Sequence, residues 1–281
     1  MPFNLPGTLV PLYALFNPRI LVPHISVADI RQLDFAALRR AGYKGAVFDK
    51  DNCLTIPHDD ILVPEVKDAW DDCLSTFGPS NVLIVSNSAG TSLDPGNFQV
   101  ESVTHHLRTP VLRHRSLKPS YTAASAVRAY FASLATPLAP HELVVVGDRI
   151  FTDVVLAHRL GHPSSFLARV ADRVRFQQYH PLTDEKAARD WAGSGPGPLS
   201  VWMTGVWKKE SMLMRRVERA LVDVVERFVP IVQERRFATE ERFVKPPPVV
   251  EEPRKEPGRS VWIWHGVQWM ARRVGFGGSK S

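Results

Sequence analysis

The stretch that most constrains the fold is residues 48–55, Phe-Asp-Lys-Asp-Asn-Cys-Leu-Thr, which follows the apolar run 45–47. The run predicts a short buried strand, and Asp49 and Asp51 stand at its carboxyl end, where ligands bind in open α/β sheets. Two close carboxylates repel each other unless a cation or a proton lies between them. The pattern therefore indicates a site for Mg²⁺, a hard ion that prefers oxygen ligands. An Asp-rich turn without a ligand is the alternative interpretation.

Further apolar runs alternate with segments of helical periodicity along the first 170 residues. Strands are expected at 82–85, within 98–117, at 143–146 and at 165–168. Helices are expected at 26–40, at 64–77, after Ser120 as an N-cap, and from Asp153 to Gly161. Strands that alternate with helices predict an α/β fold with a doubly wound parallel sheet.

Polar side chains follow the second and the later strands as well. Ser86-Asn87-Ser88-Ala89-Gly90 follows residues 82–85, and small polar groups before a glycine can hold an oxyanion, although Ser-Asn-Ser is also common turn chemistry. Lys118 precedes the helix capped by Ser120, where a lysine can reach a phosphate or can be an ordinary surface residue. Gly147-Asp148 ends the run 143–146, and Asp153 begins the next helix.

The order of these signals is more specific than any one of them. Asp-x-Asp after a strand, Ser86 after a strand, Lys118 before a helix and Gly-Asp-x-x-x-x-Asp after a strand resemble the haloacid dehalogenase (HAD) superfamily of phosphatases over roughly residues 40–170. The octet, Ile-Val-Ser-Asn-Ser-Ala-Gly, Val-Gly-Asp-Arg-Ile-Phe-Thr-Asp and the lead-in 16–25 are similar to the fungal mitochondrial phosphatidylglycerophosphate phosphatases. Cys53 departs from the Thr that is usual in the wider superfamily.

The resemblance implies roles for the carboxylates. Asp49 would attack phosphorus and form an aspartyl-phosphate, and Asp51 would protonate the leaving alcohol and later take a proton from water. Mg²⁺ would bind the Asp49 carboxylate, the Asp51 main-chain carbonyl and Asp148. Asp153 would hold the water shell of the metal or orient Lys118.

The resemblance also implies a set of groups that bind the phosphate. Ser86, Lys118 and backbone N–H groups near Asn87 would stabilise its equatorial oxygens. Arg149 would pair with a second phosphate or with Asp153, or serve only the structure. About 30 residues separate the first motif, 48–55, from the second, which begins at Ile84, and about 30 separate Ser86 from Lys118, which leaves no room for a sizeable cap domain. An uncapped, HAD-like Rossmannoid core suits a bulky substrate or one presented at a surface.

The ends of the chain differ from its centre in charge. Residues 200–281 hold 16 Lys/Arg and 10 Asp/Glu, whereas residues 1–199 hold 19 of each, so the tail carries the whole net charge of +6. The first 28 residues are apolar, broken by prolines and free of acids. We expect three parts: a lead-in and helix at 1–40 with possible membrane contact, a phosphatase core at 41–199, and a basic, amphipathic helical tail at 200–281 with a Pro-rich linker at 245–257.

The tail indicates an anionic partner. One amphipathic helix is expected at 210–229, with Met214, Val217, Leu221, Val224 and Phe228 on its apolar face, and a second follows Ser260 beside Trp262, Trp264 and Trp269. Tryptophan with basic residues on such helices is typical of contact with an anionic phospholipid surface, and no nucleic-acid partner is expected. Packing of these helices on the core is the alternative.

The resulting expectation is a Mg²⁺-dependent phosphatase that converts phosphatidylglycerophosphate to phosphatidylglycerol, upstream of cardiolipin. The resemblance places such an enzyme on the matrix side of the inner mitochondrial membrane as a peripheral protein. The alternatives are a HAD phosphatase for a phosphoprotein, a nucleic-acid end or a soluble phosphomonoester, and a catalytically idle HAD scaffold. The full set of motif residues argues against idleness.

Overall fold

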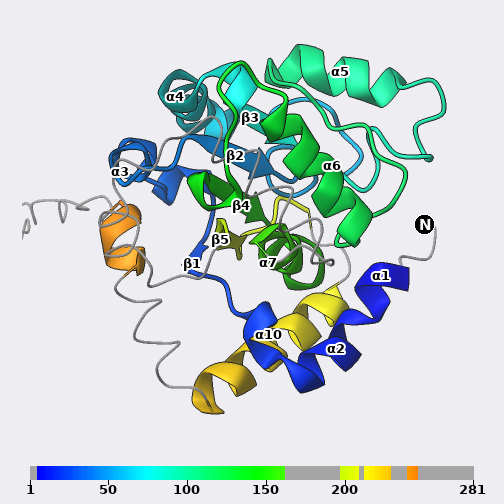
Figure 1. Ribbon diagram of the computed structural model, residues 1–281, viewed down its shortest axis with the longest axis vertical. Coiled ribbons are helices and arrows are strands. Elements are labelled where there is room, and N and C mark those ends of the chain that lie inside the picture. Colours follow the sequence, from blue (N-terminus) through cyan, green and yellow to red (C-terminus); the bar gives the residue numbers. More distant parts are fainter. Residues whose placement is uncertain (1–4, 162–196, 209–211, 229–238, 246–281) are drawn as a thin grey trace, which may run out of the picture. The chain divides into compact units, whose positions relative to one another are not determined.

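The fold is built on a five-stranded parallel sheet. The computed structural model describes residues 5–161, 197–208, 212–228 and 239–245. The strand order is β1-β5-β4-β2-β3 (Figure 1), and every neighbouring pair is parallel. The strands are β1 (Ile25–Val27), β2 (Gly45–Phe48), β3 (Val82–Ile84), β4 (Leu143–Gly147) and β5 (Leu199–Met203). The predicted α/β class with a parallel sheet is confirmed.

The register of the central strands brings their carboxyl ends to one edge. Phe48 at the end of β2 pairs with Ile84 of β3 on one side and with Val146 of β4 on the other. The residues that follow these three strands therefore leave the sheet side by side. This alignment positions the polar residues discussed below.

Alternate side chains of the central strands enter two different apolar clusters. The first cluster takes Phe48, Ile84 and Val146 and packs them against α3 (Phe35–Arg40), α4 (Lys67–Phe77) and α5 (Phe98–Leu107). The second takes Val47, Leu83 and Val145 and packs them against α6 (Tyr121–Ala132) and α7 (Val155–Gly161). Both faces of β2, β3 and β4 are therefore buried, which explains why these strands are continuous apolar runs.

Local signals account for several helix ends. The Ser120 hydroxyl accepts a hydrogen bond from the N–H of Ala123 at 3.1 Å, so the predicted N-cap of α6 is confirmed. Asp34 caps α3 in the same way through the N–H of Ala37. Gly78 ends α4 with a positive φ, which glycine adopts without strain. Short 3₁₀ turns lie at Pro18–Leu21, Ile30–Gln32, Pro64–Val66, Pro79–Asn81 and Pro140–Glu142.

A third apolar cluster joins segments that are far apart in the sequence. It packs Val10 and Ala14 of α2 (Val10–Phe16) with Val222 of α10 (Met212–Phe228), Trp202 of β5 and the π-helical turn Ile150–Val154. The short helix α1 (Leu5–Thr8) precedes α2. Residues up to Lys245 form one compact unit. No helix within the described residues is long and apolar enough to cross a membrane.

The structure corrects three local expectations. Residues 98–117 hold α5 and a single bridge between Val111 and Ile84 in place of a strand, because Val100, Val103 and Leu107 bury one helical stripe. The expected helix at 26–40 begins only at Phe35, after β1 and a 3₁₀ turn. The strand β5 crosses the expected boundary at residue 200 and lies between β1 and β4, so the sheet continues into the tail.

The predicted helix at 210–229 is confirmed as α10. The strand expected at 165–168, the helix after Ser260, and the linker at 245–257 apart from Lys245 lie outside the described residues.

Candidate active site

Asp49 lies at the centre of the polar cluster at the carboxyl edge of the sheet. It follows β2 directly, and its N–H donates to the carbonyl of Val146 at 2.9 Å, which ties the end of β2 to β4. Its Oδ1 accepts hydrogen bonds from the N–H of Lys50 and from Lys118 Nζ, both at 2.8 Å. The side chain is only 11% exposed, so the rigid sheet holds this carboxylate in a largely dehydrated position.

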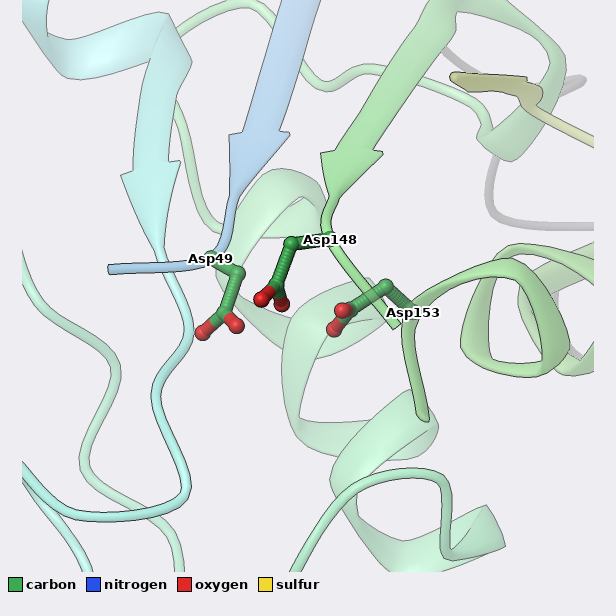
Figure 2. A group of neighbouring side chains, drawn as sticks. All are labelled: Asp49, Asp148 and Asp153. Atoms are coloured by element: carbon green, nitrogen blue, oxygen red, sulfur yellow. The ribbon is translucent and has the colours of Figure 1, made fainter. Parts of the chain in front are cut away.

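Three carboxylates converge at this edge. Asp49, Asp148 and Asp153 each bring one oxygen within 4.8 Å of the others, and Figure 2 shows the three side chains pointing toward one another. Burial and the neighbouring carboxylates raise the pKa of Asp49 to about 8, although Lys118 opposes the shift. The pKa of Asp148 is also raised, by burial and by Asp153. Such a group of buried carboxylates is costly without a cation.

The donor set of this cluster fits a hard divalent cation. All three groups offer carboxylate oxygens, which Mg²⁺ prefers, and two of them are almost fully buried. Of the four predicted metal ligands, Asp49, Asp148 and Asp153 lie together. The Asp51 side chain lies outside the cluster, and its main-chain carbonyl as a metal ligand stays a prediction.

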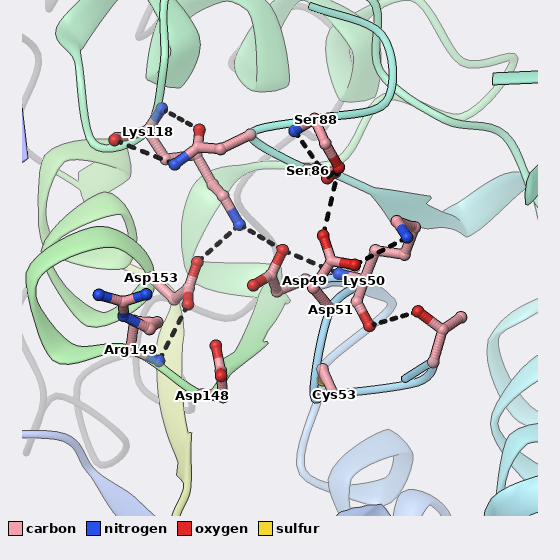
Figure 3. A network of polar contacts seen from close by, with 12 residues as sticks. Asp49, Lys50, Asp51, Cys53, Ser86, Ser88, Lys118, Asp148, Arg149 and Asp153 are labelled. Carbon is pink, nitrogen blue, oxygen red and sulfur yellow. Dashed lines mark hydrogen bonds and ion pairs between the residues drawn. The ribbon is translucent and has the colours of Figure 1, made fainter. Parts of the chain in front are cut away.

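Lys118 connects the carboxylates to the loop after β3. Its Nζ lies 2.8 Å from Asp49 Oδ1 and 2.7 Å from Asp153 Oδ1 (Figure 3), and the side chain is 2% exposed. Burial lowers the pKa of Lys118, but Asp153 and Asp49 outweigh burial and raise it overall. Its N–H donates to Asn87 Oδ1 at 2.6 Å, so the predicted pair Asn87 and Lys118 lie in contact.

The Asp51 carboxylate is held by groups other than the metal cluster. Lys50 Nζ contacts its Oδ1 at 2.8 Å, Ser88 donates to its Oδ2 at 3.2 Å, and the N–H of His58 donates to Oδ1 at 3.1 Å. The Lys50 side chain is completely buried, and it also donates to the carbonyl of Asp59 at 2.7 Å. Asp51 is therefore fixed beside Asp49 with one face toward the loop after β3.

Ser86 lies in that loop and is fully buried. Its hydroxyl accepts a hydrogen bond from the N–H of Ser88 at 3.0 Å and lies 2.9 Å from the Ser88 hydroxyl. His114 contacts the Ser86 carbonyl through Nε2 at 3.0 Å, and burial lowers the pKa of His114. The His114 ring thus braces the backbone of the predicted phosphate-binding loop from behind.

Gly147 is required by the carboxylate cluster. A Cβ at this position would overlap Cβ and Cγ of Asp153. Asp153 approaches the end of β4 this closely because its N–H donates to the carbonyl of Arg149 at 2.9 Å and its Oδ2 accepts the N–H of Arg149 at 3.2 Å. The glycine thus makes room for a side chain of the protein itself.

The helix α10 contributes two charged side chains to the same site. Arg215 is buried, forms an ion pair with the Asp148 carboxylate and donates to the Asp148 carbonyl at 3.2 Å. Glu218 is 1% exposed and accepts the N–H of Phe151 at 3.3 Å. Burial raises the pKa of Glu218 to about 7. Arg149 Nε lies 4.0 Å from Glu218, so its guanidinium approaches Glu218, while only its backbone N–H bonds Asp153.

Comparison of the sequence with known proteins identifies the family of this chain. The sequence matches the family described as mitochondrial PGP phosphatase, where PGP is phosphatidylglycerophosphate, over residues 5–170. The chain belongs to the mitochondrial PGP phosphatase family. This membership makes it a phosphoric monoester hydrolase. All the predicted site residues fall within the matched segment, whereas Arg215 and Glu218 lie beyond it.

Curated relatives carry the same family name. The chain is 35% identical to mitochondrial phosphatidylglycerophosphatase GEP4 of Saccharomyces cerevisiae over 158 residues, which is 56% of this chain and 83% of the yeast protein. It is 36% identical over 160 residues to the chloroplastic/mitochondrial PGP phosphatase 1 of Arabidopsis thaliana, which is 56% of this chain and 44% of the plant protein. The Chlamydomonas reinhardtii chloroplastic enzyme is 39% identical over 53% of this chain and 54% of its own length. No solved structure matches the chain.

Sequence reasoning missed five residues of this PGP phosphatase site: Lys50, Ser88, His114, Arg215 and Glu218. Lys50 and Ser88 stand inside the quoted motifs, so their positions were a usable signal. No motif in the sequence marks His114 or the two residues of α10. A histidine in a loop or a charged residue on a helix is ordinarily exposed to solvent, so neither signals a buried site. Only their burial against the site distinguishes them.

Proposed function

We propose that this protein is a Mg²⁺-dependent phosphatase that removes the terminal phosphate of phosphatidylglycerophosphate and leaves phosphatidylglycerol. The observation that carries the proposal is the position of the Asp49 carboxylate, 2.8 Å from Lys118 Nζ and within the cluster of Asp148 and Asp153. A buried carboxylate next to a fixed cation is suited to attack a phosphorus atom whose oxygens carry negative charge. The names of the curated relatives supply the lipid substrate.

Asp49, Asp148 and Asp153, with the Asp51 main-chain carbonyl, would hold the ion. Bound Mg²⁺ would supply the positive charge that keeps the Asp49 carboxylate ionised near neutral pH and that offsets the charge of the phosphate. Arg215 and Lys118 balance the remaining charge of Asp148 and Asp153.

The reaction divides into two displacements at phosphorus. In the first, an Asp49 oxygen forms a bond to phosphorus while the bond to the glycerol oxygen breaks, and Asp51 gives its proton to that leaving oxygen. In the second, Asp51 takes a proton from water as the water oxygen attacks the aspartyl-phosphate, which releases inorganic phosphate and restores the Asp49 carboxylate. Lys50 and Ser88 hold the Asp51 carboxylate in place for both steps.

The loop after β3 and Lys118 would receive the equatorial oxygens of the phosphate. Lys118 would offer its ammonium group, Ser86 its hydroxyl, and the loop its backbone N–H groups near Asn87. Donors fixed before the substrate arrives stabilise the charge that develops at phosphorus without reorganisation. The contact between Asn87 and the Lys118 backbone keeps the two parts of this pocket together.

We further propose a HAD-like, doubly wound and uncapped core, with the lead-in before β1 and the tail after β5 as extensions that contact an anionic phospholipid surface. The apolar clusters on both faces of the sheet support the core. The mitochondrial names of relatives support a mitochondrial location, and we place the protein there as a peripheral protein on the matrix side of the inner membrane. The product there would be phosphatidylglycerol for cardiolipin synthesis.

The test is phosphate release by the full-length protein with and without Mg²⁺. Phosphatidylglycerophosphate in vesicles is compared with glycerol phosphate and an aryl phosphate, with Asp49→Asn as the inactive control. Preference for the lipid that requires Mg²⁺ and Asp49 supports the proposal. Equal or faster turnover of the soluble esters would keep the chemistry and remove the lipid assignment. Full biological function of Asp49→Asn in cells would instead indicate a scaffold.

A further inference from the structure

The outer side of α2 is apolar and exposed. Val10 and Ala14 point into the third cluster, whereas Leu9, Leu12 and Phe16 on the opposite side are 49%, 60% and 89% exposed. Residues 1–28 contain no acidic side chain that would make this side soluble. Single exposed apolar residues are ordinary on a protein surface, but three on one stripe of a short helix are not.

The helix α10 points two charged side chains inward and several apolar side chains outward. Arg215 and Glu218 are buried because they bind Asp148 and the N–H of Phe151. Leu213, Val217 and Val224 lie on the opposite side and are 77%, 42% and 48% exposed. A surface helix normally buries its apolar stripe. The active site therefore sets the rotation of this helix, and the rotation exposes apolar side chains.

The helices that carry these two exposed apolar stripes, α2 and α10, pack on the same apolar cluster. Val10 and Ala14 of α2 and Val222 of α10 enter the same cluster, together with Ile20 and Leu21 of the turn Pro18–Leu21, which packs against both helices. Figure 1 shows both helices below the sheet in this view. Both helices bury one side in this cluster and leave the other side exposed. We call Leu9, Leu12, Phe16, Leu213, Val217 and Val224 the α2–α10 face.

The charge around this face favours an anionic occupant. Arg19, Arg216, Arg219 and Arg227 are exposed on the same turn and helix. Among the acids of α10, Asp223 is exposed, Glu226 is half-buried and Glu218 is buried. Arg216 and Arg227 lie within 60° of Leu213 on a helical wheel, given about 100° per residue. Apolar side chains flanked by arginines are typical of helices that lie in the headgroup region of an anionic membrane.

We propose that the α2–α10 face docks on an anionic lipid bilayer and places the active site next to the headgroups. The inference rests on the proposed lipid substrate. Arg215 and Leu213 stand on opposite sides of one helix, so the Asp148 carboxylate lies about one helix diameter, roughly 10 Å, from the docked surface. A phosphorylated headgroup can cover that distance while its acyl chains remain in the membrane.

The test is co-sedimentation of the full-length protein with substrate-free vesicles of phosphatidylglycerol and phosphatidylcholine, compared with phosphatidylcholine alone. Leu213→Asp and Phe16→Asp should each weaken binding to anionic vesicles about tenfold or more, since each removes one large apolar contact. Phe98→Asp is the matched control, because Phe98 is also 77% exposed but lies on α5. The double variant Arg216→Gln/Arg227→Gln should reduce the preference for anionic vesicles and leave binding to neutral ones unchanged.

Each outcome decides the proposal. Unchanged vesicle binding of Leu213→Asp and Phe16→Asp, or an equal loss in Phe98→Asp, overturns it. A dimer of the wild-type protein that Leu213→Asp converts to a monomer without loss of vesicle binding also overturns it and makes the face an interface between copies. Thermal unfolding midpoints confirm that the variants fold. Because the vesicles contain no substrate, failure of docking is separate from failure of the proposed hydrolysis, which the wild-type assay measures.

Discussion

The Nζ atom of Lys118 lies 2.7 Å from Oδ1 of Asp153, and both side chains are almost completely buried. The ion pair joins the start of α6 to the turn after β4, and the same ammonium group reaches Asp49. A buried cation between two carboxylates is strongly held, because loss of either partner leaves an uncompensated charge.

Lys118→Met should abolish most of the activity. The variant removes the charge that neutralises Asp49 and Asp153 and that would stabilise the phosphate, so we expect kcat to fall by about 10²–10³-fold. Single-turnover hydrolysis of an aryl phosphate measures the effect. Lys67→Met, on the exposed side of α4, is the control and should retain full activity. A loss smaller than about threefold in Lys118→Met would contradict a role at phosphorus.

Gly147→Ala should disrupt the carboxylate cluster without touching any charged residue. The added methyl group would displace Asp153, so we expect weaker Mg²⁺ binding, lower activity and a loss of stability of about 1–3 kcal/mol. Titration of activity against Mg²⁺ measures the first two effects. Gly42→Ala is the control, because Gly42 has a positive φ and no atom near the added Cβ. It should lose stability through backbone strain and keep its Mg²⁺ dependence.

Lys50→Met should lower kcat and leave KM largely unchanged. Lys50 contacts Asp51 and the carbonyl of Asp59 and would not contact the substrate, so it acts by positioning the acid and base. Loss of a positioned proton donor costs about 10²–10⁴-fold in rate, which bounds the expected effect. Lys44→Met removes a half-exposed lysine paired with Glu142 and serves as the matched control. A rise in KM at constant kcat would show that Lys50 binds the substrate directly.

Glu218 should make stability fall as the pH rises from about 4.5 to 7. Its pKa is raised from 4.5 to about 7 in the folded protein, so the folded state keeps a proton that the unfolded state loses. The contribution of Glu218 to the free energy of unfolding is fully present below pH 4.5. The free energy of unfolding is lower by about 3 kcal/mol once Glu218 is ionised in both states above pH 7.

Glu218→Gln cannot ionise, and its unfolding free energy should therefore lack this decline. Urea unfolding at several pH values between 5 and 8 compares it with the wild-type protein, and the difference should grow with pH in favour of the variant. A constant difference across this range would indicate that Glu218 is ionised in the folded state throughout.

Much of the central site was predictable because its residues stand at strand ends. A buried parallel strand is a continuous apolar run, and its carboxyl end delivers the next polar residue to a common edge. For this reason Asp49, Ser86 and Asp148 were identified as neighbours although about 100 residues separate the first from the last. The cap of α6 at Ser120 was predictable from local chemistry alone.

The wrong predictions concern segments in which tertiary contacts override the local hydrophobic pattern of the sequence. Residues 98–107 read as part of a strand segment but form α5, because their buried positions recur at helical spacing against the first cluster. The expected boundary at residue 200 falls inside β5, because Leu199–Met203 completes the sheet between β1 and β4. A five-residue apolar run does not indicate which strands it pairs with, because those strands lie far away in the chain.

By itself, the sequence determined the strand ends, the order of the motif residues and therefore the kind of chemistry that they can perform. Only the tertiary structure decided which charges are buried. Lys50 and Arg215 look like ordinary surface cations in the sequence, but the fold buries both against Asp51 and Asp148. Burial of a charge requires a partner of opposite sign, and the partner of Arg215 lies 67 residues away. That pairing also fixes the rotation of α10 and hence which of its side chains face outward.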